Sequence, residues 1–233
     1  MPEFTTHNAL VLGKKTLGEN TFILSLFTKE YGRHLGVLKK KTPPEIGTLV
    51  QATWKARLPE QLGTFYIEEI KAYAPLFLDD IGRLNVLVNL CAILDKSLPE
   101  RQIYDFLHEQ TLFFLNDLTN DHFLKNYIRF ETELLSALGF ALDMTECAGG
   151  GNSLDLAYIS PKTGRAVSKE KGLPYHNKLL KLPRFLWQES APYSNEDLTD
   201  GLTLTGHFLS THLGELPSSR PQLYRDIQRR KDG

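Results

Sequence analysis

Cationic side chains are concentrated in the first third of the chain, and their chemistry suits contact with phosphate groups. Lysine and arginine displace the counterions of a nucleic acid when they bind its backbone. Aromatic rings nearby in the sequence, such as Tyr31 and Tyr66, are candidates for stacking against bases. We therefore predict a nucleic-acid-binding surface; the alternative is charge spread over solvated faces. The candidate contact residues are Lys14, Lys15, Arg33, His34, Lys39, Lys40, Lys41, Lys55 and Arg57.

The distribution of charge is more informative than the formal net charge of -1. Residues 1–78 contain 10 Lys and Arg against 7 Asp and Glu, and residues 148–187 contain 7 against 2. The intervening residues 79–147 are acidic, with 5 against 12. Two basic segments on either side of an acidic one favour a surface that faces a polyanion.

The residues that most often carry catalysis or bind metals are scattered. The seven histidines show no nucleophile–base or metal-ligand spacing, and the glycines at 149–151 lack the lysine of a phosphate-binding loop. Two cysteines, Cys91 and Cys147, are too few for a disulfide framework and are typical of a reducing compartment. We predict no catalytic residue, no metal and no cofactor.

The sequence shows no pattern typical of a targeting signal or a membrane span. The N-terminus lacks the charged and then apolar stretch of a signal peptide, and no apolar run reaches membrane-spanning length. We expect a cytoplasmic protein with no membrane partner.

The basic residues require a β-rich unit to position them. Residues 48–58 alternate, with Trp54 among the apolar residues of one face and Lys55 on the other, so we expect Trp54 in the core. Residues 13–20 are polar and glycine-containing, which indicates a loop. Five short strands in about seventy residues favour a five-stranded OB-fold barrel over residues 1–78. The expected strands are 4–12, 21–29, 35–38, 48–58 and 63–71.

Helical periodicity replaces alternation after Pro75, and the fold class is therefore α+β. We predict a second, helical domain over residues 79–233, with a small strand-turn-strand insertion at 143–187. Its strands are expected at 156–160 and 164–168. The expected helices are 79–98, 100–117, 121–138, 195–213 and 220–230.

Two cations on the third predicted helix are candidates for binding a partner. Lys125 and Arg129 are four residues apart beside apolar positions, so they predict a basic-rimmed pocket for an acidic peptide with an aromatic end. The alternative pairs them with Glu133 and Asp121 on the same helix.

The sequence resembles the RecO family of bacterial recombination mediators over nearly its full length. Residues 18–37 read Gly-Glu-Asn-Thr-Phe-Ile-Leu-Ser-Leu-Phe-Thr-Lys-Glu-Tyr-Gly-Arg-His-Leu-Gly-Val, and residues 138–143 read Leu-Gly-Phe-Ala-Leu-Asp. The segment Asp-Leu-Ala-Tyr at 155–158, with Ser-Pro-Lys at 160–162, is most similar to alphaproteobacterial members.

The resemblance implies a non-enzymatic DNA repair protein with an N-terminal DNA-binding barrel. It implies binding to single- and double-stranded DNA and annealing of complementary strands. It also implies contact with RecR and with the C-terminal tail of single-stranded DNA-binding protein (SSB), and indirect action on RecA. On the matching positions, it places DNA contacts at Lys14, Lys15, Arg33 and residues 39–41.

One departure from the family pattern concerns metal binding. Many relatives have a four-cysteine zinc module after the third helix, where this chain has only Cys147. A structural zinc requires four nitrogen or sulfur ligands, so we predict no metal here.

Two other functions are compatible with the same residues. An OB-fold RNA-binding adaptor would use the same cations but read the 2′-hydroxyl. A nucleic-acid hydrolase would require a catalytic site assembled from distant parts of the sequence. Under the RecO resemblance, the second basic segment, residues 162–184, either extends the DNA surface or binds RecR.

Overall fold

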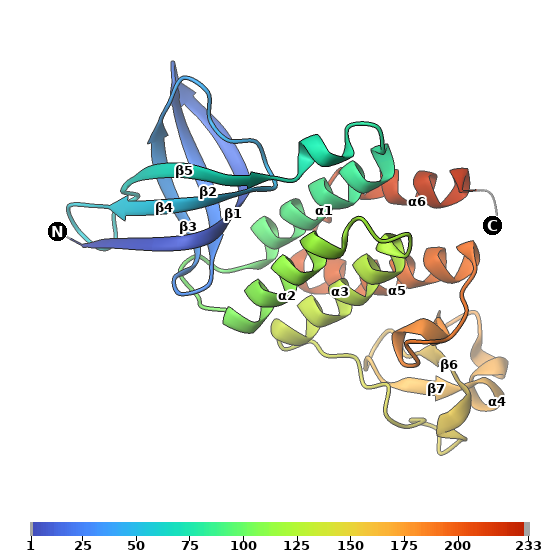
Figure 1. The fold of residues 1–233 in the computed structure, drawn as a ribbon. Coiled ribbons are helices and arrows are strands. Elements are labelled where there is room, and N and C mark those ends of the chain that lie inside the picture. Colours follow the sequence, from blue (N-terminus) through green and yellow to red (C-terminus); the bar gives the residue numbers. More distant parts are fainter. Residues whose placement is uncertain (1, 231–233) are drawn as a thin grey trace. The chain divides into compact units, whose positions relative to one another are not determined.

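The computed structural model describes residues 2–230 (Figure 1). It divides into two compact units, Met1–Leu118 and Thr119–Gly233. A domain boundary at 78/79 stays a prediction. No helix among the described residues combines the length and apolar character needed to cross a membrane.

The first unit contains a closed barrel of five strands in the order β1-β2-β3-β5-β4. This confirms the predicted fold class, a strand barrel followed by helices. The strands pair antiparallel except β3 and β5, which are parallel and joined at Val37 and Thr64. The strands are β1 (Glu3–Gly18), β2 (Thr21–Thr28), β3 (Gly32–Lys39), β4 (Thr48–Lys55) and β5 (Thr64–Ala72).

The barrel interior is filled by the alternate residues that the sequence pattern assigns to it. Trp54 is 2% exposed and packs with Leu24, Ala52 and Phe65. Gly36 faces the same interior, where an added Cβ would lie 2.5 Å from the Phe65 ring. Only glycine therefore allows this close approach of β3 to the aromatic core.

Strand β1 is longer than the sequence predicts. The polar residues at 13–18 continue the strand because Lys14 pairs with Leu24 and Lys15 with Ile23 of β2. A tight turn follows, in which Asn20 adopts a positive φ of 54°. The prediction of a loop at 13–20 was wrong because pairing with β2 outweighs the weak local strand preference of these residues.

Two helices complete the first unit. Helix α1 (Ile81–Ser97) is capped at its N-terminus by Asp80, whose carboxylate accepts a hydrogen bond from the Arg83 backbone N–H. Helix α2 spans Asp105–Asp117 and begins five residues later than predicted. The segment before it is not helical because it lies along β3, where the Arg101 backbone N–H donates to the Arg33 carbonyl at 2.7 Å.

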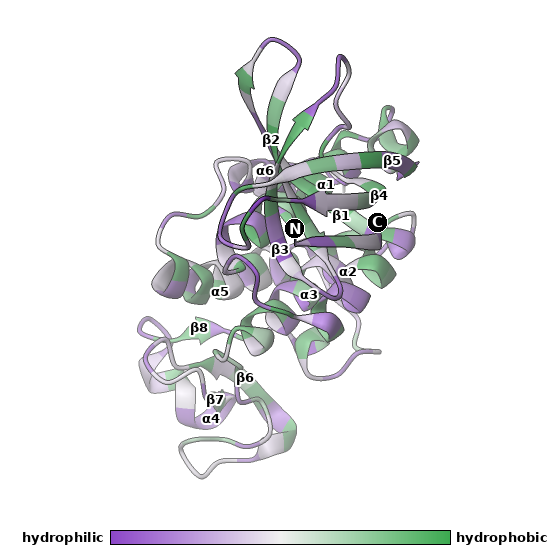
Figure 2. Ribbon diagram, turned by 90° about the vertical axis from the view of Figure 1, so that its left-hand side faces the viewer, coloured by the Kyte–Doolittle hydropathy of each residue, from purple (hydrophilic) through white to green (hydrophobic). Residues whose placement is uncertain are grey.

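The second unit is helical with a small sheet in the order β7-β6-β8. Its helices carry both hydrophobic and hydrophilic residues, as expected for one buried side (Figure 2). The main elements are α3 (Phe123–Ala137), β6 (Leu156–Ile159), β7 (Ala166–Ser168), α4 (Lys169–Gly172), β8 (Leu180–Lys181), α5 (Asn195–Leu213) and α6 (Arg220–Arg229). The 3-10 turns within residues 2–230 are η1 (Ala74–Phe77) in the first unit and η2 (Ser153–Asp155), η3 (Leu173–Tyr175) and η4 (Arg184–Leu186) in the second.

A buried ion pair joins three helices of the second unit. Glu131 of α3 is 0% exposed and Arg220 of α6 is 4% exposed. The Arg220 guanidinium binds both Glu131 carboxylate oxygens and donates to Thr205 Oγ1 of α5 at 3.1 Å. Burial alone would lower the pKa of Arg220, but the charge and the hydrogen bonds of Glu131 raise it, so Arg220 stays positively charged.

Candidate nucleic-acid interface

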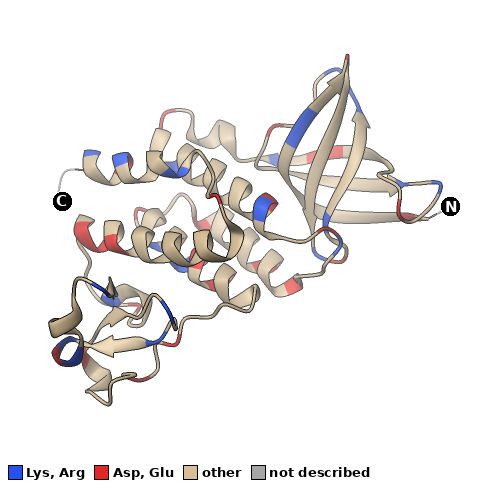
Figure 3. Ribbon diagram, turned by 180° about the vertical axis from the view of Figure 1, so that it is seen from behind, with Lys and Arg blue, Asp and Glu red and all other residues tan. Residues whose placement is uncertain are grey.

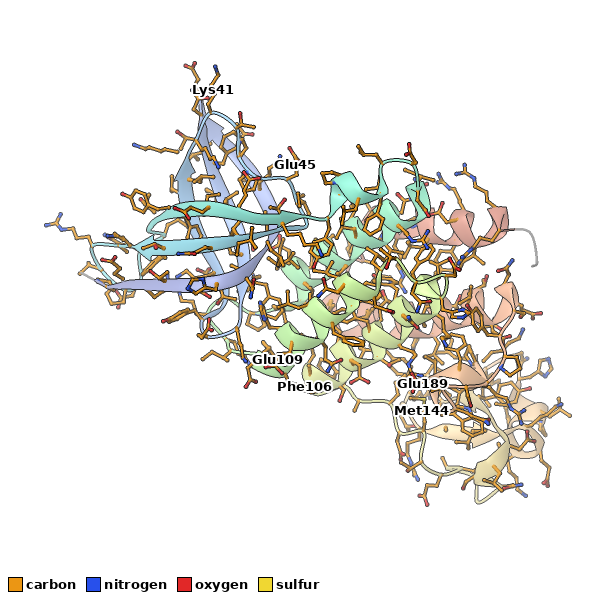
Figure 4. The ribbon with its side chains drawn as sticks, in the orientation of Figure 1. Lys41, Glu45, Phe106, Glu109, Met144 and Glu189 are labelled. Atoms are coloured by element: carbon orange, nitrogen blue, oxygen red, sulfur yellow. The ribbon has the colours of Figure 1, made fainter. Side chains whose placement is uncertain are left out.

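Four of the predicted lysines come together at one end of the barrel. Lys39 pairs with Thr21 across β3 and β2, and the Lys40 backbone N–H donates to the Asn20 carbonyl at 3.0 Å. Lys15 lies on β1, on the other side of β2 from Lys39. Figure 4 shows Lys41 at the projecting end of the barrel. We call Lys15, Lys39, Lys40 and Lys41 the tip cluster.

The outer surface of the barrel connects the tip cluster to the remaining basic residues. Strand pairing places Lys15, Ile23, Val37, Thr64 and Lys55 in one row across β1, β2, β3, β5 and β4. Neighbouring strands lie about 4.8 Å apart, so this row follows the curved surface of the closed barrel for roughly 20 Å. Figure 3 shows Lys and Arg at the projecting end of the barrel and again at the end near the N-terminus.

Some of these cations have carboxylate partners. Lys14 pairs with Glu45 at 2.8 Å, Lys40 with Glu69 at 3.2 Å, and Lys55 with Glu3 at 2.8 Å. Both side chains are exposed in the Lys40 and Lys55 pairs. In the Lys14 pair, Glu45 is exposed and Lys14 is partly buried. Exposed pairs contribute little stability, so a phosphate can replace the carboxylate. Among the candidate contact lysines and arginines, all of which the structure describes, those without an ion pair are Lys15, Lys39, Lys41 and Arg57.

An exposed aromatic ring accompanies the cations at the end of β4. Tyr66 is 60% exposed, and the Lys55 ammonium lies 6.0 Å from its ring centroid. Trp54 and Phe65 are in the core, and Tyr31 stacks on Phe4 with centroids 3.8 Å apart. Of the predicted stacking residues, Tyr66 therefore has the most accessible ring.

Arg33 and His34 do not belong to this surface, so we remove both from the candidate contact residues. Arg33 donates to the Leu98 carbonyl at 2.7 Å and pairs with Asp95 at 3.3 Å, so it fastens β3 to α1. His34 is 5% exposed inside the barrel, 4.7 Å from the Trp54 ring centroid. The alternation of strand residues in the sequence already indicated that His34 is buried, because His34 shares the inward face with Gly36 and Leu38.

The buried imidazole of His34 predicts a pH-dependent stability. Burial, and secondarily the charge of Arg101, lower its pKa from 6.5 to about 4. The unfolded chain therefore binds this proton more readily, so the His34 contribution is fully present above about pH 6.5 and is lost as the pH falls toward 4. The loss amounts to roughly 3 kcal/mol at most.

Urea unfolding between about pH 7.5 and 4.5 measures this effect. His34→Phe should flatten the pH dependence, because phenylalanine suits the aromatic surroundings and does not titrate. His7→Phe changes an exposed histidine instead and should retain the wild-type slope. Equal slopes for wild type and His34→Phe would contradict the prediction.

In the second unit, Lys125 borders a cavity of about 740 Å³. Its ammonium lies 5.6 Å from the ring centroid of Tyr193, whose hydroxyl is hydrogen-bonded to His122 Nδ1 at 2.6 Å. Arg230 also lines the cavity, and its guanidinium lies 4.8 Å from the Phe123 ring centroid. Sequence reasoning missed Arg230 because it belongs to the C-terminal segment, far from α3 in sequence.

Arg129 does not line this cavity. Its guanidinium donates to the Phe185 carbonyl at 3.3 Å and pairs with Glu189 at 3.6 Å. The structure therefore does not bring Lys125 and Arg129 to one pocket wall, although both are on α3.

The surroundings of Cys147 do not fit a structural zinc ion. Burial raises the pKa of its thiol, but hydrogen bonds from Ser168 and from the backbone of Gly151 and Gly149 outweigh burial and lower it to about 7. Ser168 supplies its backbone N–H to Sγ at 3.1 Å, where a zinc site would need further thiolates or imidazoles. Within residues 2–230, no three His, Cys, Asp or Glu side chains form a metal site.

Cys91 is an interior thiol in the first unit. It is 0% exposed on α1, and burial raises its pKa to about 12. A thiol of this kind stays protonated and acts as a small apolar group.

Comparison with known proteins adds family information to this geometry. A family model described as "Recombination protein O C terminal" matches residues 78–221. A DNA repair protein RecO from Rhodospirillum centenum is 40% identical over 228 residues, covering 92% of this chain and 91% of the relative. Proteins of the same description from Jannaschia sp. and Rickettsia canadensis are 37% and 36% identical, covering 95% and 88% of this chain and 95% and 87% of the relatives.

Proposed function

Because the chain belongs to the RecO family of DNA repair proteins, we propose that it is a recombination mediator that binds single- and double-stranded DNA and anneals complementary strands. The observation that carries the proposal is the row of outer barrel positions joining the tip cluster to Lys55. It acts in the bacterial cytoplasm, at the nucleoid during repair, and converts no substrate.

The physical basis is neutralisation of phosphates together with base stacking. The tip cluster and Arg57 supply ammonium and guanidinium groups, and each phosphate contact releases counterions. Tyr66 supplies an exposed ring beside Lys55. Stacking on one ring and contact with the backbone do not depend on base sequence, as an annealing protein requires.

The proposed partners follow from the same family membership. We propose that the protein works with RecR and helps to load RecA on DNA coated with SSB. The cavity beside Lys125 is proposed to take the C-terminal tail of SSB, because an acidic tail with an aromatic end suits the two cations Lys125 and Arg230 and the ring of Tyr193 in its lining.

A salt-titrated binding assay on a labelled single strand tests the DNA-binding proposal. We expect the logarithm of the binding constant to fall linearly with the logarithm of salt concentration, with DNA preferred over structured RNA of equal length. A flat salt dependence would overturn the proposal, and a preference for RNA would favour an RNA-binding adaptor. Specific cleavage in the presence of Mg²⁺, abolished by one carboxylate change, would indicate a hydrolase.

The tail-binding proposal predicts that Lys125→Glu weakens binding of an acidic synthetic peptide with a C-terminal phenylalanine at least about tenfold, because it places like charges together. Arg129→Glu should have a smaller effect, since Arg129 is not part of the cavity lining and is held by the Phe185 carbonyl and by Glu189. Fluorescence anisotropy measures both, with Lys178→Glu as an exposed control in the same unit. If Lys125→Glu binds the peptide like wild type, the tail is held elsewhere.

A further inference from the structure

Arg101 adopts a backbone conformation that is unusual for its residue type. Its φ is 65°, in the left-handed region that glycine, asparagine and aspartate occupy more readily. It lies between α1 and α2, where its backbone N–H donates to the Arg33 carbonyl of β3. Such a conformation persists when surrounding contacts hold it, and it often marks a functional position.

The side chain of Arg101 reaches the loop between β4 and β5. Nη1 donates to the Pro59 carbonyl, and Nη2 donates to the Gln61 carbonyl at 3.1 Å. The guanidinium also lies 5.8 Å from the ring centroid of Trp54. A planar guanidinium can bind two carbonyls at once, which a lysine ammonium at one point does less well.

This loop, residues 56–63, depends on Arg101 for its central attachment. At its ends, Ala56 N–H donates to the Pro2 carbonyl and Trp54 Nε1 donates to the Leu62 carbonyl. Between these ends, the two hydrogen bonds that join Leu58 and Gln61 are internal to the loop. Within residues 2–230, Arg101 thus supplies the bonds that tie residues 57–61 to the rest of the unit.

The loop carries Arg57, an exposed cation beside Lys55. We propose that Arg101 is a positioning residue for DNA binding: it fixes the 56–63 loop so that Arg57 is held next to Lys55 and Tyr66. This inference rests on the proposed function. Arg101 acts through Arg57, because its Nη1 and Nη2 donate to Pro59 and Gln61 and its Nε pairs with Glu100 at 3.5 Å.

A double-mutant cycle with Arg57→Ala and Arg101→Ala tests the inference on the full chain. Each single variant should weaken binding of a labelled single strand by roughly fivefold and reduce the salt slope by about one phosphate contact. The double variant should bind no more weakly than Arg57→Ala alone. If the two losses of affinity multiply in the double variant, Arg101 contacts DNA itself. If Arg101→Ala binds the strand with wild-type affinity, the contact of Arg101 with the loop is purely structural. Either result overturns the inference.

Arg101→Lys keeps the experiment decisive if the alanine variant folds poorly. It retains the charge but bridges the two carbonyls less well than the guanidinium does, so a positioning role predicts a loss approaching that of Arg57→Ala. Retained wild-type affinity would instead assign a direct charge contact and overturn the inference. Arg225→Ala is the charge-matched control in the other unit. Wild-type protein that failed to bind DNA would overturn the proposed function itself.

Discussion

Glu131→Ala is expected to destabilise the second unit by about 3–5 kcal/mol, the usual cost of removing one partner of a buried ion pair. The guanidinium of Arg220 is enclosed and would lose both carboxylate bonds, keeping only the neutral acceptors Thr205 Oγ1 and the Leu202 carbonyl. These acceptors do not compensate a desolvated positive charge. Urea unfolding followed by circular dichroism measures the change.

A control on the same helix separates this effect from general sensitivity of α3. Glu133 is exposed, so Glu133→Ala should change the free energy of unfolding by no more than about 0.5 kcal/mol. The double variant Glu131→Leu with Arg220→Met should recover much of the lost stability, because it removes both charges together. If Glu131→Ala unfolds at the same urea concentration as Glu133→Ala, the pair does not hold the three helices together.

The barrel shows which structural features can be predicted from alternation and which cannot. Alternation placed Trp54 in the core and Lys55 outside, and both placements are confirmed. The same rule, applied to Arg33 and His34, would have placed one of them inside. A run of charged residues suggested a common role for both, although neighbouring strand residues face opposite sides.

Features that depend on distant residues could not be predicted. Glu131 and Arg220 are 89 residues apart, and neither has a local pattern that indicates its partner. Arg101 was expected within a helix, because the pairing of its backbone with Arg33 has no signal in the sequence of either segment. Likewise, residues 13–18 became a strand only through pairing with β2. Local propensity gives way to tertiary contacts in the last two cases.

Removing the charges of residues 39–41 is expected to have the largest effect on DNA binding. Each phosphate contact on a single strand contributes a salt slope of about 0.7, so three contacts contribute roughly a hundredfold in affinity near 0.1 M salt. Lys39→Ala, Lys40→Ala and Lys41→Ala combined should therefore weaken binding by up to about that factor and flatten the slope by about 2. The part due to Lys40 should be smaller, since Lys40 must first leave Glu69.

The matched control removes three exposed lysines from the other unit, with Lys162, Lys169 and Lys178 changed to alanine. Both triple variants lower the net charge of the chain equally, so a general electrostatic attraction would weaken binding equally in both. A local contact at the tip cluster predicts a large change in the first and a small one in the second, because phosphates respond mainly to cations within a Debye length of about 10 Å. A larger loss in the second variant would move the interface to the insertion between α3 and α5.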